Sequence, residues 1–172
     1  VHRQRRPRCE DPSMRVLAID PGLAATGWAL VDDTRLVGSG TVTTPTGSPM
    51  AERAAKIALE LLTASAPLRH GPIPVTLVIE CPDSAFGGKA FQGVMRNFFV
   101  AGFLAGALSE KYGFAAPVLV NPSTWTAGKG RSRERMEAKR QLAVRVFRVS
   151  GRTSEHERDA LGIALWAISG GV

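Results

Sequence analysis

Three carboxylates in this chain stand beside apolar segments, where a charge loses hydration. Asp20 and Glu80 each close an apolar run, and Asp159 comes immediately before another. Burial disfavours the charged form of a carboxylate, and three carboxylates gathered together also repel one another. We therefore expect cations to compensate them, and two hard divalent ions would do so through oxygen ligands.

The segments that must position these carboxylates alternate between strands and helices. Turn signals at Pro21-Gly22 and Asp32-Asp33 separate the first three strands. Strands are predicted at 15–20, 27–32, 36–43, 75–80 and 117–120. Helices are predicted near 54–62, 90–111, 132–148 and 155–169, where apolar residues recur at helical spacing. The prolines from Pro67 to Pro74 are expected to end the first helix, and the order as a whole predicts an α/β fold that begins as a β-meander.

Composition favours a single domain over 14–172. The chain has 172 residues, of which 44% are hydrophobic, enough for a sizeable core. The longest apolar stretch, 98–108, is too short to span a bilayer as a helix, and no signal peptide opens the chain. Cys9 and Cys81 form neither a disulfide framework nor a zinc-site spacing. These features predict a cytoplasmic or nucleoid-associated protein without a membrane partner.

Positive charge is concentrated in two segments. The net charge is +7, and eight basic residues against two acidic ones give the segment 129–148 a net charge of +6. Clustered positive charge is typical of a surface that binds a polyanion, although a solvated helix face has the same composition. Residues 1–13 hold four further arginines and are expected to be a basic flexible arm or a leader before Met14.

Two predicted helices have faces that suggest partners. On the helix near 132–148, Arg131, Arg135 and Lys139 follow at intervals of four residues and suit phosphates, while Leu142 and Val146 are expected to face the core. The helix near 90–111 is apolar nearly all round. One of its faces can cover the sheet and the other needs a partner, which predicts a homodimer.

Several short motifs follow one another through the chain. The segment 16–22 reads Val-Leu-Ala-Ile-Asp-Pro-Gly and is followed by Thr26-Gly27-Trp28. Further motifs are 78–80, 101–108, Asn121-Pro122-Ser123 with Gly128-Lys129-Gly130, and 156–164. From Met14 to about Ile168 this order resembles the RuvC-type Holliday junction resolvases. The resemblance implies an RNase H-like fold, a five-stranded mixed sheet with three antiparallel strands and then parallel strands, flanked by helices.

The resemblance also implies which side chains act. The catalytic, metal-binding carboxylates of that family fall on Asp20, Glu80 and Asp159, and a fourth position, acidic or histidine, falls on His156. On a helix His156 and Glu155 share a face with Asp159. His156 is therefore a metal ligand, a group that contacts the attacking water or an ordinary surface histidine, and Glu155 is the alternative for its role.

The implied chemistry is hydrolysis of a DNA phosphodiester bond. Two Mg²⁺ ions, which Mn²⁺ could replace, would be held by these side chains with Asp20 between them, one activating water and the other stabilising the leaving 3′ oxygen. The products would have a 5′ phosphate and a 3′ hydroxyl.

Contacts with branched DNA are implied as well. Basic residues of the loop and the following helix are expected to bind phosphates: Lys129, Arg131, Arg133, Arg135 and Lys139. An aromatic residue after the second acidic strand is expected to unstack a base pair, and Phe86 is a better candidate than Phe91 because glycines flank it. Trp125 either stacks on a base or packs the loop.

These observations together predict a Mg²⁺-dependent endodeoxyribonuclease that resolves four-way junctions as a homodimer in recombination and repair. The alternative is a related RNase H-like nuclease that acts on flaps, other branched DNA or RNA-containing substrates. A non-catalytic DNA-bending protein would explain the charge but not the carboxylates. The expected compartment is the cytoplasm with its nucleoid, or the DNA-containing compartment of an organelle or virus, and branch-migration machinery is a further candidate partner.

Overall fold

The apolar run before Asp20 forms strand β1 (Arg15–Asp20), in which residues 16–19 are completely buried. A strand that is covered on both faces needs no alternation of polar and apolar residues, and this strand has none. The structure is a computed structural model that describes residues 14–69, 71, 73–81, 91–109, 114–126 and 133–172. Within these residues β1 is the middle strand of a five-stranded sheet.

The sheet is mixed, with the order β3-β2-β1-β4-β5. Strands β2 (Ala25–Asp32) and β3 (Arg35–Thr43) form antiparallel pairs. Strands β4 (Val75–Glu80) and β5 (Val118–Val120) are parallel to β1. The predicted sheet, with three antiparallel strands followed by parallel strands, is confirmed.

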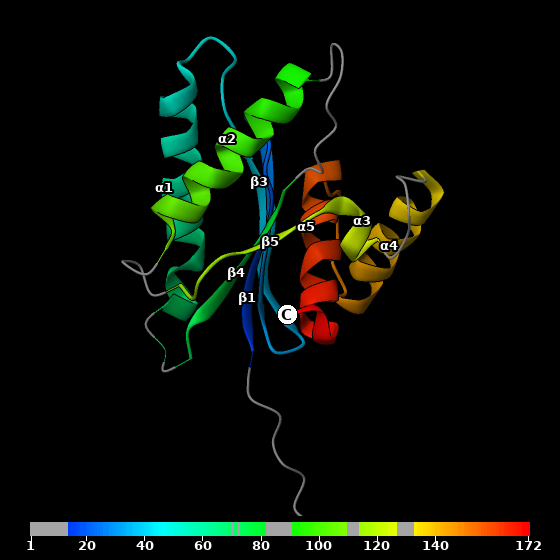
Figure 1. Cartoon of the computed structure of the whole chain (residues 1–172). Coiled ribbons are helices and arrows are strands. Elements are labelled where there is room, and N and C mark those ends of the chain that lie inside the picture. Colours follow the sequence, from blue (N-terminus) through cyan, green and yellow to red (C-terminus); the bar gives the residue numbers. More distant parts are fainter. Residues whose placement is uncertain (1–13, 70, 72, 82–90, 110–113, 127–132) are drawn as a thin grey trace, which may run out of the picture.

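Helices cover both faces of the sheet (Figure 1). Helices α1 (Met50–Arg69) and α2 (Phe91–Ala107) lie on one face. On the other face lie α3 (Pro122–Trp125), α4 (Arg133–Val146) and α5 (Glu155–Trp166), and a π-helical turn, η3 (Ala167–Gly171), follows α5. Because side chains alternate along a strand, β1 contributes Leu17 and Ile19 to the core under α1 and α2, and Val16 and Ala18 to the core under α5.

The register of the parallel strands brings two of the predicted carboxylates together. Strands β1 and β4 pair residue by residue up to Ile19 and Ile79. Asp20 and Glu80 are the next residues of these two neighbouring strands, so both stand at the same edge of the sheet. This edge is the carboxyl end of the parallel strands, where ligands bind in open α/β sheets.

The first helix ends within the segment from Pro67 to Pro74, as expected, although α1 continues past Pro67 itself to Arg69. A proline in the last turn removes one backbone hydrogen bond, to the carbonyl four residues earlier, and this loss is small near a helix end. Leu68 is buried in the core beyond it, which stabilises the extra turn.

The prediction that Leu142 and Val146 of the basic helix face the core is wrong. Leu142 and Val146 of α4 are exposed at 40% and 47%, whereas Arg140, Ala143 and Phe147 are buried. Leu142 and Val146 follow Lys139 at intervals of three and seven residues, so they share its solvent-facing side. Sequence reasoning also missed α3, which lies between the strand predicted at 117–120 and the helix predicted near 132–148.

The remaining helices end close to their predicted limits. The last helix begins at Glu155 as expected, where the side chain of Ser154 accepts a hydrogen bond from the backbone N–H of Glu157 and caps the helix. In the described part of the chain, none of the helices has the length and apolar character that crossing a membrane requires.

Candidate active site

Asp20 stands at the end of β1, where the backbone turns into the Pro21-Gly22 segment, and it is buried. Oδ2 of Asp20 lies 2.6 Å from Nδ1 of His156, at the start of α5. The ring of His156 can therefore donate a hydrogen bond to this carboxylate. Two residues 136 positions apart in the sequence thus meet at one edge of the sheet.

The close fit of α5 on β2 makes this meeting possible. Gly27 of β2 pairs with Asp20 across the sheet, and a Cβ on Gly27 would overlap the backbone carbonyl of His156. The turn between the two strands is held by Thr26, whose hydroxyl donates to the Gly22 carbonyl at 2.8 Å. The Thr-Gly pair of the sequence motif therefore fixes the turn and lets α5 approach the sheet.

Asp159 lies one turn further along α5 and is also buried. Both of its carboxylate oxygens accept hydrogen bonds from Arg140 of α4, at 2.5 Å from Nε and 2.7 Å from Nη2. Such a paired arginine–carboxylate contact is strong and directional. It compensates the buried charge of Asp159 within the protein itself.

Glu80, at the end of β4, is half-buried and has a different donor. The indole N–H of Trp125 in α3 donates to Oε2 of Glu80 at 2.6 Å. Trp125 is almost completely buried and packs beside Gly162 of α5, where a Cβ would collide with its ring. Trp125 therefore packs α3 against α5, and it also orients the Glu80 side chain.

The charges of these groups influence one another. The hydrogen bond with Asp20 raises the pKa of His156, which favours the protonated ring. Burial raises the pKa of Asp159, and the guanidinium of Arg140 opposes that rise. The negative charge of Asp20 also raises the pKa of Asp159, so the two carboxylates lie close enough to repel each other.

Asp20 and His156 face a cavity of about 560 Å³ beside the edge of the sheet. Its wall includes the turn after β1 and residues near the starts of α1 and α2, among them Arg53 and Arg96. Arg53 holds this wall together, because it donates to the Leu23 carbonyl at 3.0 Å and to the Thr44 hydroxyl at 2.8 Å.

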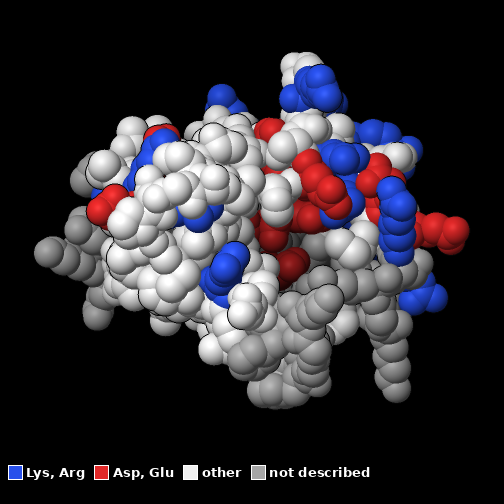
Figure 2. Space-filling view, turned by 90° about the horizontal axis from the view of Figure 1, so that it is seen from above, with Lys and Arg blue, Asp and Glu red and all other residues white. Residues whose placement is uncertain are grey.

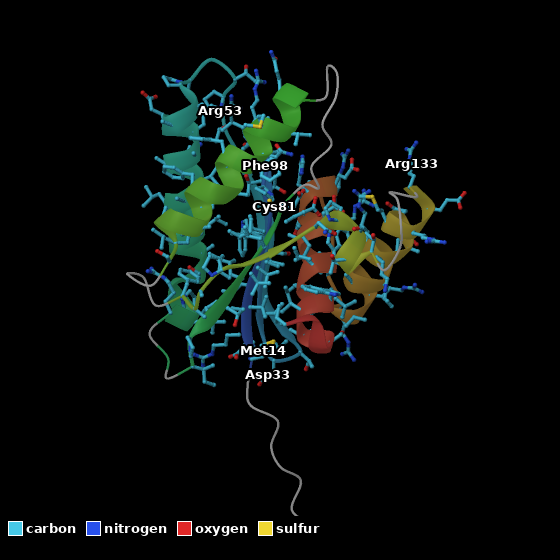
Figure 3. The ribbon with its side chains drawn as sticks, in the orientation of Figure 1. Met14, Asp33, Arg53, Cys81, Phe98 and Arg133 are labelled. Carbon is cyan, nitrogen blue, oxygen red and sulfur yellow. The ribbon has the colours of Figure 1, made fainter. Side chains whose placement is uncertain are left out.

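The charges at this end of the molecule are unevenly distributed. Figure 2 shows acidic side chains gathered in and around a hollow over the end of the sheet, with Lys and Arg side chains on the surface around it. In Figure 3, Arg53 and Arg133 lie on opposite sides of Cys81, the residue that follows β4. Basic surroundings attract a polyanion, and an acidic centre attracts cations, so this distribution suits a polyanion that is brought to a cation site.

Comparison with known proteins identifies the family. The chain is 31% identical over 160 residues to the crossover junction endodeoxyribonuclease RuvC of Azorhizobium caulinodans, covering 88% of each chain. The chain belongs to the RuvC family. The RuvC protein of Burkholderia mallei is 29% identical over 176 residues, which cover 92% of this chain and 85% of that one. No family model matches the sequence.

Solved structures of RuvC proteins have the same fold. RuvC of Thermus thermophilus, in complex with a Holliday junction substrate, superposes with a TM-score of 0.69 at 20% identity and covers 91% of this chain and 96% of that one. The yeast mitochondrial Holliday junction resolvase gives a TM-score of 0.54 at 10% identity, with coverage of 91% and 80%. The RNase H-like fold expected for a RuvC-type protein is thereby confirmed.

The structure places the predicted RuvC site residues in three groups. Asp20 and His156 are in contact, Asp159 is within electrostatic range of both, and Glu80 is on the strand next to Asp20. Glu155 is largely exposed and accepts a hydrogen bond from Arg140 at 2.9 Å.

The predicted DNA-binding residues are described only in part. Arg133 and Arg135 are exposed on α4, and Lys139 is half-exposed there. Phe86, Lys129 and Arg131 lie outside the described residues, as does the side chain of Phe91.

Sequence reasoning missed that Arg140 and Trp125 contact the carboxylates of the candidate site. Arg140 was one of eight basic residues in a basic segment, and nothing in its type separates it from its exposed neighbours. Its spacing to Ala143 and Phe147, three and seven residues, was the available signal for a buried face. For Trp125, the available signal was its place in a short helix that an Asn-Pro-Ser sequence starts, where Trp125 is buried.

Proposed function

We propose that this protein is an endonuclease that resolves four-way DNA junctions by metal-dependent hydrolysis of phosphodiester bonds. Membership of the RuvC family supports the activity, and the names of the relatives supply the substrate class. The single observation that supports a working site is the contact of Asp20 with His156 at a cavity of about 560 Å³, close to Asp159.

The donor set fits a hard divalent cation in its chemistry. Carboxylate oxygens are the ligands that Mg²⁺ and Mn²⁺ prefer, and Asp20, Glu80 and Asp159 offer them at one end of the sheet. As the side chains lie, the described residues contain no cluster of three acidic, histidine or cysteine groups ready to hold an ion. Each carboxylate instead accepts a hydrogen bond from a protein donor, which a cation would replace or share.

We infer that Asp20, Glu80, Asp159 and His156 hold Mg²⁺, two ions in number, with Mn²⁺ as a substitute. When bound, such ions activate a water molecule and stabilise the charge that develops on the phosphate and the leaving 3′ oxygen. The side chains of the protein orient the centre: His156 fixes Asp20 through its ring nitrogen, and Trp125 fixes Glu80 through its N–H.

The substrate strand would enter through the cavity beside Asp20. Arg96 is exposed on its wall, and Arg133 and Arg135 are exposed on the opposite side of the sheet end. These residues would bind backbone phosphates, which position DNA but do not read its sequence. The sequence adds four residues to this proposal. Phosphates would also be bound by Lys129, Arg131 and Lys139, and a base pair would be unstacked by Phe86.

Cleavage of a panel of DNA substrates tests this function. The wild-type protein is incubated with Mg²⁺ and a mobile four-way junction, a linear duplex, a flap or an RNA–DNA hybrid. We expect paired, symmetric nicks in the junction and little cutting of the other three. Equal cutting of flaps or hybrids would instead favour a general structure-selective nuclease, and tight binding to the junction without cutting would favour an architectural role.

We further propose that the protein acts as a homodimer through α2. Its sheet-facing residues Val100 and Leu104 are buried, whereas Met95 and Phe99 on the opposite side are exposed at 49% and 36%. Gly102 lies on the same exposed side and has free space around its Cβ position, so another backbone could approach there. Two copies related by a twofold axis could present two active sites to opposing strands of a junction.

Phe99→Glu is expected to make the protein monomeric, because it places a charge in the apolar stripe. Light scattering after gel filtration measures the mass, and the paired nicks should change to slow single nicks. Val37→Glu is a matched control, since Val37 is exposed to a similar degree, 40%, on edge strand β3. A dimer of unchanged stability in Phe99→Glu would place the interface elsewhere.

A further inference from the structure

Arg140 is the feature of the site that the proposed chemistry does not use. It is buried, with 6% of its surface exposed, although it belongs to a helix whose other basic residues mostly face solvent. A buried guanidinium is costly unless acidic groups surround it. Besides the two bonds to Asp159, Arg140 contacts Glu155 at 2.9 Å and Glu137 at 3.5 Å.

This position excludes a role in binding phosphates. Its donors are directed to three carboxylates, and the paired bond with Asp159 raises the pKa of Arg140 further above its high ordinary value. Arg140 is thus a fixed internal cation. The exposed Arg133 and Arg135 remain available for DNA on the same helix.

The guanidinium of Arg140 also occupies the position beside Asp159 where the carboxylate would attract a metal ion. Both oxygens of Asp159 already accept a bond from Arg140, at 2.5 and 2.7 Å. A divalent cation at Asp159 must therefore share these oxygens or displace the guanidinium. Two positive centres a few ångströms apart repel each other strongly when both are poorly hydrated.

The surroundings leave room for such an exchange. A cavity of about 420 Å³ lies beside Arg140, and its lining includes Glu137, Glu155 and Arg158. A guanidinium that withdraws from Asp159 toward this cavity remains next to two carboxylates. Its charge would stay compensated after a metal ion has taken over Asp159.

We propose that Arg140 is a positioning residue that holds Asp159 in place before the metal arrives and competes with the divalent ion for that carboxylate. The inference rests on the metal-dependent function proposed above. It predicts two opposite effects of removing Arg140. The affinity for the ion rises because a competing charge is lost, and cleavage at saturating ion falls because Asp159 is no longer oriented.

Calorimetric titration of the DNA-free protein with Mn²⁺ tests the first effect. For Arg140→Gln we expect at least about tenfold tighter binding than for wild type, given the interaction between charges at this distance. Arg145→Gln is the matched control, because Arg145 is an exposed arginine on the same helix. This control should bind Mn²⁺ with nearly wild-type affinity, whereas an equal rise in both variants would show a general charge effect and overturn the proposal.

Junction cleavage at saturating Mn²⁺ tests the second effect. We expect a loss between about 10-fold and 100-fold in Arg140→Gln, the size typical of a displaced catalytic group. Arg140→Lys covers the case in which the glutamine variant does not fold, since it keeps the charge but not the paired donors. It should bind Mn²⁺ about as wild type does and still cleave more slowly.

The outcomes separate the inference from the function on which it rests. Suppose that wild-type protein cleaves with Mn²⁺ but Arg140→Gln binds the ion no more tightly than wild type. That result would refute the competition between Arg140 and the ion, and the metal-dependent function would stand. Wild-type cleavage rates in Arg140→Lys would refute positioning. Absence of any Mn²⁺ binding or cleavage in wild type would reject the metal-dependent function together with the inference.

Discussion

Asp20→Asn is expected to lower junction cleavage by about 10³-fold or more, while junction binding changes little. The carboxylate at the end of β1 is a proposed ligand of the metal ions, which would stabilise the transition state by several kcal/mol, or about 10³-fold in rate. The side chain is largely buried beside His156, with 13% of its surface exposed, and its negative charge attracts no phosphate. Its loss should therefore affect the chemistry far more than the binding.

Single-turnover cleavage and gel-shift binding with the same junction measure the two effects. Asp33→Asn serves as the control, because Asp33 is exposed in the turn between β2 and β3 and asparagine tolerates its positive φ of 54°. This control should cleave at the wild-type rate. Appreciable cleavage by Asp20→Asn would remove Asp20 from the proposed metal centre.

Gly27→Ala is expected to destabilise the protein by about 3 kcal/mol, the upper part of the range for overpacked cores, and to abolish cleavage as well. A Cβ at this buried position overlaps the backbone carbonyl of His156. Backbone atoms cannot rotate away as a side chain can, so α5 must move off the sheet. The contact between His156 and Asp20 would then be lost together with the packing.

Urea denaturation and junction cleavage give the two readouts for this variant. Gly47→Ala is the control, since a Cβ there meets no other atom within 4 Å and the position is exposed. The control should be as stable and as active as wild type. Wild-type stability in Gly27→Ala would show that α5 has more freedom on the sheet than its close contact with β2 indicates.

The strands that position Asp20 and Glu80 could be predicted from the sequence. Strands β1 and β4 begin and end at the predicted residues, because in each an apolar run stops at a single carboxylate. The order of the sheet followed from the resemblance to a known family rather than from periodicity. The approach of His156 to Asp20 also depended on that resemblance, since 136 residues separate them.

The donors that hold the carboxylates could not be predicted in the same way. The rotation of α4 about its axis decides whether Arg140 or Leu142 faces inward, and the pattern of residues 140–147 contains both an Arg140-Ala143-Phe147 face and a Leu142-Val146 face. Arg140 can be buried because three carboxylates compensate its charge. Asp159 and Glu155 belong to α5, and Glu137 lies one turn earlier on α4. Single-segment patterns contain no information about such a match.

The distance along the chain between Asp20 and His156 has a consequence for synthesis. While a ribosome extends the chain, β1 to β4 can pair once residue 80 has emerged, but His156 and Asp159 are added much later. A nascent chain therefore has the strands that carry Asp20 and Glu80 but lacks two of the four side chains of the proposed metal centre. By the proposed assignment, a new copy can cut DNA only after α5 has been released and has docked against β2.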